Sequence, residues 1–265
     1  MPEGHTVHRT ANQFNELFAG QPLAVSSPQG RFNSGAKSIT GRTLLRARAI
    51  GKQLFLEFDN QLTLRIHLGI YGKWSFSKLE GELPEVTGQV RARFSNKFAN
   101  ADLRGPTVCE VISTDEVRLV EKRLGPDPLN PNPRGRELAR FIERVSKSKT
   151  PIGLALMNQD VISGIGNVYR AEILFRAGLS PHTPGNKLAI EQITELWHDS
   201  VKLMKIGVAT GFMITRDEFA KKNPGKSERN FVYKREGLPC RICGTNISLE
   251  VMASRKLYWC VACQR

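Results

Sequence analysis

The stretch Gly125-Pro-Asp-Pro-Leu-Asn-Pro-Asn-Pro133 places four prolines within nine residues and separates two different sequence patterns. Proline fixes its own φ and has no N–H to donate to a helix or a strand ladder. A segment this rich in proline predicts a stiff linker between domains. We therefore expect an N-terminal domain over residues 1–124, a linker over 125–133, and further domains beyond it.

The residues before this stretch predict one helix followed by antiparallel strands. Apolar side chains recur with helical spacing over about residues 2–20: Val7, Ala11, Phe14, Leu17 and Phe18. Apolar residues then alternate over 54–58 and again over 62–68, with a polar turn between them, which predicts a hairpin. Three further strands are expected, over 89–96, 107–113 and 116–120. The first half therefore predicts a β-sandwich that carries an N-terminal helix, within an α+β multidomain protein.

The residues after the linker predict a helical domain over 134–228. Helical apolar spacing covers four segments: 136–145, 151–158, 167–178 and 189–207. A final domain over 229–265 carries four cysteines.

These cysteines form two pairs, Cys240-Arg-Ile-Cys243 and Cys260-Val-Ala-Cys263, with sixteen residues between them. This spacing is typical of a zinc site, because a tight turn directs both thiolates of a pair at one metal. Four sulfur ligands close the coordination shell, so we expect one structural Zn²⁺ ion. Two disulfides are the alternative, which an intracellular setting disfavours. Cys109 lies in an apolar stretch and is expected to be a small core residue.

The charge balance favours an anionic partner. Lys and Arg total 39 against 25 Asp and Glu, which gives a net charge of +14 and a pI of about 9.9. Nucleic acid is the usual partner of so basic a protein, although a basic protein without such a partner is the alternative. No apolar run approaches the about 18–20 residues of a membrane span, and no signal peptide is evident, so we expect a cytoplasmic, nucleoid-associated protein.

Three segments outside the cysteine pairs have features of a DNA-contacting surface. Gly164-Ile-Gly-Asn167 opens a helix, where glycines and free N–H groups suit a phosphate, or where Asn167 simply caps the helix. Ile70 and Tyr71 lie between two glycines and could fill the hole left by an extruded base, or pack inside the protein. Arg255 is expected in the turn 253–256 of a hairpin, facing phosphates or solvent.

Two further segments predict reactive groups. By strand alternation Lys52 falls on an apolar face, either because it works beside an active site or because it reaches solvent at the strand's end. The chain opens Met1-Pro2-Glu3, and loss of Met1 would leave the secondary amine of Pro2 beside a carboxylate. A loose terminus is the alternative.

Together these segments resemble the formamidopyrimidine-DNA glycosylase / endonuclease VIII family of base-excision repair enzymes. The matching motifs run along nearly the whole chain: Met1-Pro2-Glu3-Gly4, Gly51-Lys52, His67-Leu-Gly-Ile-Tyr-Gly72, Gly125-Pro-Asp-Pro-Leu129, Gly164-Ile-Gly-Asn167, Phe231-Val-Tyr233 and the four cysteines. The resemblance implies a β-sandwich, a helix-two-turns-helix domain and a zinc-ribbon hairpin, with DNA between them.

The resemblance also implies roles for individual residues. Pro2 would attack the sugar as a Schiff-base nucleophile, Glu3 would be the general acid, and Lys52 would assist proton transfer and hold a phosphate. Glu172 corresponds to a family carboxylate near the active site and is counted with the catalytic residues. The expected DNA contacts are His67, Ile70, Tyr71, Asn167, Tyr233 and Arg255. The damaged DNA would be bound by a monomer.

Two departures from the family pattern bear on the substrate. Thr6 stands where relatives often carry a second glutamate, and the Asp-Pro-Arg-Arg-Phe-Gly loop of the oxidised-purine branch is absent. The ending Tyr71-Gly72-Lys73-Trp74 is closer to endonuclease VIII, so oxidised pyrimidines are the expected substrate. An oxidised-purine glycosylase, a noncatalytic DNA-damage binding protein and a zinc-ribbon regulator are the alternatives.

Overall fold

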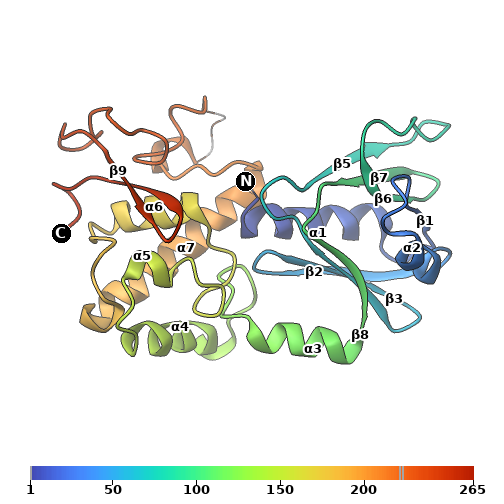
Figure 1. The fold of residues 1–265 in the computed structure, drawn as a ribbon, viewed down its shortest axis with the longest axis horizontal. Coiled ribbons are helices and arrows are strands. Elements are labelled where there is room, and N and C mark those ends of the chain that lie inside the picture. The colour runs from blue at the N-terminus through green and yellow to red at the C-terminus, as the bar shows by residue number, and fades with distance from the viewer. Residues whose placement is uncertain (1, 221, 223) are drawn as a thin grey trace. The chain divides into compact units, whose positions relative to one another are not determined.

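The structure is a computed structural model that describes residues 2–220, 222 and 224–265 (Figure 1). The chain divides into two compact units, Met1–Arg123 and Leu124–Arg265. Within the described ranges, no helix is long and apolar enough to cross a membrane.

The first unit is a β-sandwich with a long helix, α1 (Gly4–Phe18), as the sequence predicted. One antiparallel sheet has the strand order β1-β6-β7-β5: β1 (Ala24–Ser26), β6 (Val90–Ser95), β7 (Ala99–Arg104) and β5 (Lys73–Lys78). The other has the order β2-β3-β4-β8: β2 (Leu44–Ile50), β3 (Gln53–Phe58), β4 (Leu62–His67) and β8 (Val108–Ser113). A short helix, α2 (Asn33–Ile39), precedes β2 and was not predicted.

Strand alternation places the first unit's core on one face of the predicted hairpin. Leu54 and Leu56 of β3 and Leu64 of β4 are fully buried, together with Phe14 and Phe18 of α1. Side chains that alternate along a strand point to opposite faces of the sheet, so the apolar ones form a continuous layer here. The hairpin and the N-terminal helix are therefore confirmed.

The prediction of a strand over 116–120 is wrong, because these residues belong to a helix, α3 (Thr114–Arg123). Its start is a capping box: the Glu116 N–H donates to Ser113 Oγ (3.3 Å), and the Ser113 N–H donates to Glu116 Oε2 (2.8 Å). Val117 of this helix packs on Phe55, on the other face of β3. The Ser-x-x-Glu signal was present in the sequence and outweighs the short apolar alternation.

The second unit combines helices with a C-terminal hairpin. The α-helices are α4 (Arg136–Ser146), α5 (Ile152–Ala155), α6 (Asn167–Arg176) and α7 (Ile190–Thr210), with 3₁₀ turns η1 (Pro133–Gly135), η2 (Gly185–Lys187) and η3 (Asp217–Phe219). The strands β9 (Ser248–Met252) and β10 (Arg255–Trp259) pair in antiparallel. Trp197, Tyr169 and Phe141 are buried in the helical core. The finer division into domains 134–228 and 229–265 stays a prediction, because both stretches lie in this one unit.

The proline-rich stretch lies against the second unit rather than in solvent. The Gly125 N–H donates to the Gln159 carbonyl (2.8 Å), and the Ser163 N–H donates to the Pro126 carbonyl (2.9 Å). Asp127 is 2% exposed. The backbone groups of Gly125 and Pro126 therefore form hydrogen bonds with the 158–163 turn, although they belong to no helix or strand. The start of this stretch is packed against the second unit.

Candidate functional site

The N-terminal residues are held at the start of α1. Glu3 occupies the N-cap position with extended backbone (φ −124°, ψ 180°), and its carbonyl accepts the Thr6 N–H (2.9 Å). The Glu3 side chain is fully buried and does not cap the helix. Pro2 is half-buried. A carboxylic group is therefore fixed in the interior one residue after Pro2.

Hydrogen bonds between α1 and β2 place Glu3 and Lys52 at the same end of the first unit. The Gly20 N–H donates to the Leu44 carbonyl (2.8 Å), and Asn15 exchanges two hydrogen bonds with the Ala47 backbone (2.8 and 2.7 Å). The helix therefore runs antiparallel to β2. Twelve residues of helix from Asn15 to Glu3 span about 18 Å, and five residues of strand from Ala47 to Lys52 span about 17 Å. Figure 1 shows the start of α1 and the β2–β3 turn at one end of the unit.

His67 lies beside Lys52. The register of β3 and β4 pairs Gln53 with His67, and Lys52 directly precedes Gln53 in the β2–β3 turn. Burial and the positive charge of Lys52, with a further contribution from Arg65, lower the pKa of His67. A neutral imidazole beside an ammonium group gives two side chains that can each donate a hydrogen bond to a phosphate. Strand pairing thus brings together two residues that the sequence predicted separately.

The loop between β4 and β5 presents Ile70 and Tyr71 to solvent. Their exposed fractions are 57% and 85%, so they do not pack inside the protein. The Gly72 N–H donates to the Leu68 carbonyl (2.9 Å), which closes a tight turn. A Cβ at Gly72 would lie 2.3 Å from that carbonyl oxygen, so this turn requires glycine. Exposed apolar side chains on a fixed turn suit the predicted wedge, which stays a prediction.

His5, in the first turn of α1, predicts an acid-sensitive first unit. Burial, together with the positive charges of Arg9 and His8, lowers the pKa of His5 to about 4. Between pH 6.5 and 4 the unfolded chain binds a proton that the folded chain does not, so the free energy of unfolding falls as the pH falls. The shift corresponds to a loss on the order of 3 kcal/mol.

Chemical unfolding of the wild type and of His5→Gln at about pH 7 and about pH 4.5, values on either side of the ordinary histidine pKa, checks this expectation. The variant should lose less stability over this range than the wild type. An equal loss in both proteins would show that His5 is not the titrating group.

In the second unit, Asn167 joins α6 to the C-terminal hairpin. Its Nδ2 donates to the Lys256 carbonyl (2.9 Å), and its Oδ1 accepts from the guanidinium of Arg170. Arg170 is fully buried and also donates to the Lys256 carbonyl (3.1 Å). Asn167 therefore lies next to the strand that begins with Arg255. Arg170 was not among the residues predicted from the sequence, because its carbonyl acceptor belongs to a distant strand.

The hairpin turn is shorter than predicted. Ala253 and Ser254 alone form it, with φ values of 47° and 63°, and Arg255 is already paired with Met252 as the first residue of β10. Positive φ at both turn residues is the hairpin geometry that matches the twist of the strands. Arg255 is exposed. An exposed guanidinium at the start of a fixed strand suits a phosphate contact.

Glu172 lies one turn further along α6 and is fully buried. Its Oε1 accepts the N–H groups of Val232 (2.8 Å) and Tyr233 (2.7 Å), and its Oε2 accepts the Phe231 N–H (2.7 Å) and the Thr215 hydroxyl (2.5 Å). The segment that carries Tyr233 is therefore held on α6 by one carboxylate. The catalytic role of Glu172 stays a prediction.

The four predicted cysteine ligands meet at one point. Their sulfur atoms all lie within 4.8 Å of one another, with 3.9 Å between Cys240 and Cys263 and 3.5 Å between Cys243 and Cys260. A tetrahedral ion with metal–sulfur bonds of about 2.3 Å requires sulfur separations of about 3.8 Å. All four are free cysteines in this structure. These residues can hold one metal ion.

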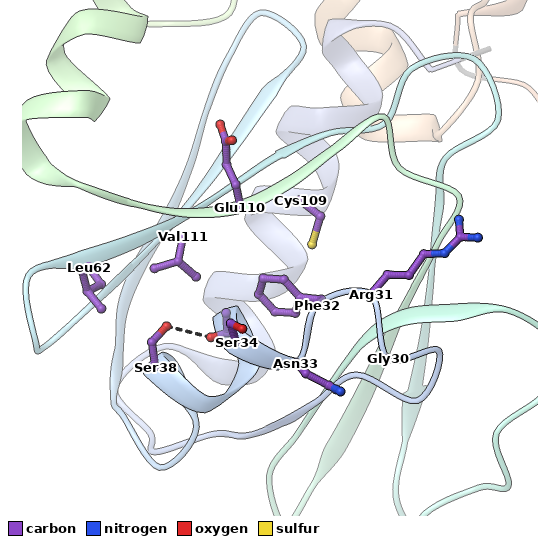
Figure 2. A pocket seen from close by; sticks show the side chains of 11 residues that line it. Gly30, Arg31, Phe32, Asn33, Ser34, Ser38, Leu62, Cys109, Glu110 and Val111 are labelled. Atoms are coloured by element: carbon purple, nitrogen blue, oxygen red, sulfur yellow. Dashed lines mark hydrogen bonds between the residues drawn. The ribbon is translucent and has the colours of Figure 1, made fainter.

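A separate hollow of about 540 Å³ lies between α2 and β8 (Figure 2). The Cys109 sulfur points into it, beside Phe32. Burial raises the pKa of the Cys109 thiol to about 12, so this thiol is not a nucleophile near neutral pH. Cys109 packs against the first unit's core, in line with the sequence interpretation.

Comparison with known proteins agrees with this arrangement. Residues 1–128 match the formamidopyrimidine-DNA glycosylase N-terminal domain, and residues 124–218 match the H2TH domain of the same enzymes. The chain is 44% identical over 273 residues to endonuclease 8 1 of Mycobacterium tuberculosis, with both proteins covered in full. It is 28% identical over 270 residues to endonuclease 8 of Escherichia coli, again with full coverage of both. The MutM (Fpg) structure from Thermus thermophilus superimposes with a TM-score of 0.79 at 28% identity, covering 99% of this chain and 98% of that one.

The fold and the site define a DNA glycosylase of base-excision repair. The β-sandwich, the H2TH helices and the four-cysteine hairpin occur here in the order that the sequence predicted. The chain belongs to the formamidopyrimidine-DNA glycosylase / endonuclease VIII family, whose members are DNA glycosylases with AP lyase activity.

Proposed function

We propose that this chain is a bifunctional DNA glycosylase/AP lyase that removes oxidised bases, oxidised pyrimidines in preference, through a Schiff base on Pro2. The observation that carries the proposal is the buried Glu3 carboxyl one residue after Pro2, at the end of the unit where Lys52 and His67 lie. A nucleophile, an acid and two phosphate-binding groups at one end of a rigid unit are what this reaction needs. The enzyme acts as a monomer on DNA in the cytoplasm.

Removal of Met1 supplies the nucleophile. A terminal amine has a reference pKa of about 7.7–8.0, so a useful fraction is neutral near pH 7, whereas a lysine at about 10.4 requires a large shift. The Pro2 nitrogen attacks C1′ of the damaged nucleotide, the bond between C1′ and the base breaks, and the base leaves with the electron pair of that bond and takes up the proton that the Pro2 nitrogen loses. Glu3 protonates the sugar-ring oxygen as the ring opens. Because the proline amine is secondary, the product is a cationic iminium.

The iminium makes strand cleavage possible. Its positive charge acidifies the C2′ hydrogen, so a proton leaves C2′ and the 3′ phosphate departs by β-elimination. A second elimination then releases the 5′ phosphate. Lys52 assists proton transfer and, with His67, holds a phosphate. Each elimination breaks one C–O bond and needs no external oxidant or reductant.

The remaining predicted residues would bind DNA. Asn167, Tyr233 and Arg255 grip the backbone around the extruded nucleotide, while Ile70 and Tyr71 fill its place in the stack. The net charge of +14 favours such a partner. Damaged bases pair weakly, so their extrusion costs less free energy.

The preference for oxidised pyrimidines rests on the sequence. The chain lacks the Asp-Pro-Arg-Arg-Phe-Gly loop of oxidised-purine enzymes, and its 44% and 28% identical relatives are both named endonuclease 8. A panel of duplexes with single oxidised pyrimidines or oxidised purines tests this preference. We expect faster single-turnover excision of the pyrimidines. Faster excision of the purines would show that the chain prefers oxidised purines, as expected of the formamidopyrimidine-DNA glycosylase branch.

Zn²⁺ is the ion we propose for the four cysteines, because four thiolates in tetrahedral geometry suit zinc. Bound there, it would hold the β9–β10 hairpin and supply no chemistry to the reaction. Chelation should therefore abolish DNA cleavage, because Arg255 loses its place.

Circular dichroism and tryptophan fluorescence of the chelated protein would check that the first unit stays folded. Re-addition of Zn²⁺ should restore cleavage. Full activity in metal-free protein would contradict the role given to the hairpin.

A further inference from the structure

The segment from Thr215 to Tyr233 leaves the end of α7 and returns to the hairpin, and its two limbs meet on Glu172. On the outgoing limb the Thr215 hydroxyl donates to Glu172 Oε2, and on the returning limb three successive N–H groups donate to the same carboxylate. The limbs also bond each other, since the Thr215 N–H donates to the Arg229 carbonyl (3.0 Å). Residues 221 and 223 of this segment lie outside the described residues.

Arg176, one turn further along α6, fixes the outgoing limb. Its guanidinium donates to the Thr215 carbonyl (2.7 Å) and to Asp217 (3.4 Å), while Asp199 of α7 accepts two hydrogen bonds from it (2.7 and 2.9 Å). Glu172 and Arg176 are four residues apart and lie on the same helix face. The base of the segment is therefore held by two charged residues of α6.

The Glu172 carboxylate has no lone-pair site left to accept a further hydrogen bond. A carboxylate has about four lone-pair sites, and the protein fills four of them with donors at 2.5–2.8 Å. Taking a proton from a substrate would require giving up one of these bonds in a fully buried place. This geometry suits a fixed structural charge and not a proton carrier.

Tyr233 is the residue that this charge places. The Glu172–Tyr233 hydrogen bond fixes its backbone, and its ring lies edge-on to Tyr258 with 5.1 Å between ring centroids. Tyr258 lies on β10, three residues after Arg255. Tyr233 is half-buried, so part of its side chain reaches the surface beside the hairpin.

We propose that Glu172 is a positioning residue that acts through Tyr233: it holds the returning limb so that Tyr233 contacts DNA beside the hairpin, and it does not touch the reacting atoms. This proposal rests on the proposed function, because the DNA contact of Tyr233 is part of it. It revises the catalytic role that the family resemblance implies for Glu172.

The test compares binding with chemistry in Glu172→Gln, Tyr233→Ala and the double variant. Glutamine has the same shape, but in either orientation its NH₂ group faces at least one backbone N–H donor, so at least one of the four hydrogen bonds is lost. We expect the Kd for a duplex with a tetrahydrofuran abasic analogue to rise about tenfold or more. The single-turnover cleavage rate at a true abasic site, with saturating protein, should stay within about threefold of wild type. In the Tyr233→Ala background, Glu172→Gln should raise the Kd less than about twofold further.

Hydrogen exchange of the 231–233 amides gives a readout that does not depend on activity. These amides should exchange faster in Glu172→Gln and as in wild type in Glu143→Gln, whose carboxylate is exposed on α4 and pairs with Lys147. Thr215→Val removes one hydrogen-bond donor to Glu172. It should also speed the exchange of the 231–233 amides and raise the Kd, but by less than Glu172→Gln does. This variant keeps the test valid if Glu172→Gln does not fold.

Three results would overturn the proposal: a lower rate at saturation with an unchanged Kd, additive effects in the double variant, or unchanged exchange. If the wild-type protein itself does not cleave abasic-site DNA, the proposed function fails, while the exchange and Kd measurements still decide the role of Glu172.

Discussion

A chain that keeps one residue in front of Pro2 should cleave abasic-site DNA at least about 10³-fold more slowly than the chain that begins at Pro2. An amide nitrogen has its lone pair delocalised into the carbonyl and cannot attack C1′. Lys52, at the same end of the first unit, does not replace it, because a lysine would need a large pKa shift to be a neutral nucleophile near pH 7.

The matched pair of proteins comes from one preparation. A fusion whose protease site ends directly before Pro2 is assayed before and after cleavage of the tag, so every other residue is identical. DNA affinity should change little, because the contacts assigned to Asn167 and Arg255 lie in the second unit. Equal cleavage rates before and after tag removal would count against a terminal-amine nucleophile.

Glu3→Gln should slow base excision by about 10²–10⁴-fold, the usual contribution of a general acid. Glutamine fits the fully buried place of Glu3 but cannot deliver a proton to the sugar oxygen. Cleavage of a preformed abasic site should fall much less, because its ring opens without the enzyme's acid. Single-turnover rates on a damaged base and on an abasic site separate the two steps.

Glu16→Gln is the control for this substitution, since Glu16 is exposed on the same helix. It should leave both rates unchanged. A Glu3→Gln protein that excises bases at the wild-type rate would remove Glu3 from the mechanism, and equal losses on both substrates would give it a different role.

The parts of the fold that could be predicted are those with strong periodicity or fixed spacing. Alternation over 54–68 indicated the hairpin and its buried face, and the spacing of the cysteines indicated their convergence. The strand expected over 116–120 failed because a five-residue apolar alternation is compatible with one helix face, and the capping box at Ser113 decides the outcome. Helix α2, at Asn33–Ile39, has too few turns for its periodicity to stand out.

The candidate site was predictable as a set of residues but not as an arrangement. The motif that contains Lys52 and the one that contains His67 are separate in sequence, and only the β3–β4 register brings them together. The sequence also could not reveal that Glu172 accepts three backbone N–H groups. Every residue except proline has such a donor, so residue types do not indicate which N–H groups meet a side chain. Arg170 shows the same limit: a buried arginine on an apolar helix is recognised only once its carbonyl acceptor is in view.

We expect the covalent bond to DNA to form at the Pro2 nitrogen. Borohydride reduction during reaction with abasic-site DNA, followed by proteolysis and mass spectrometry, tests it most directly. A stable adduct is expected on the N-terminal peptide, attached to Pro2 and lost when a residue precedes it. An adduct on Lys52 or any other lysine, or cleavage without an adduct, would contradict a Pro2 nucleophile.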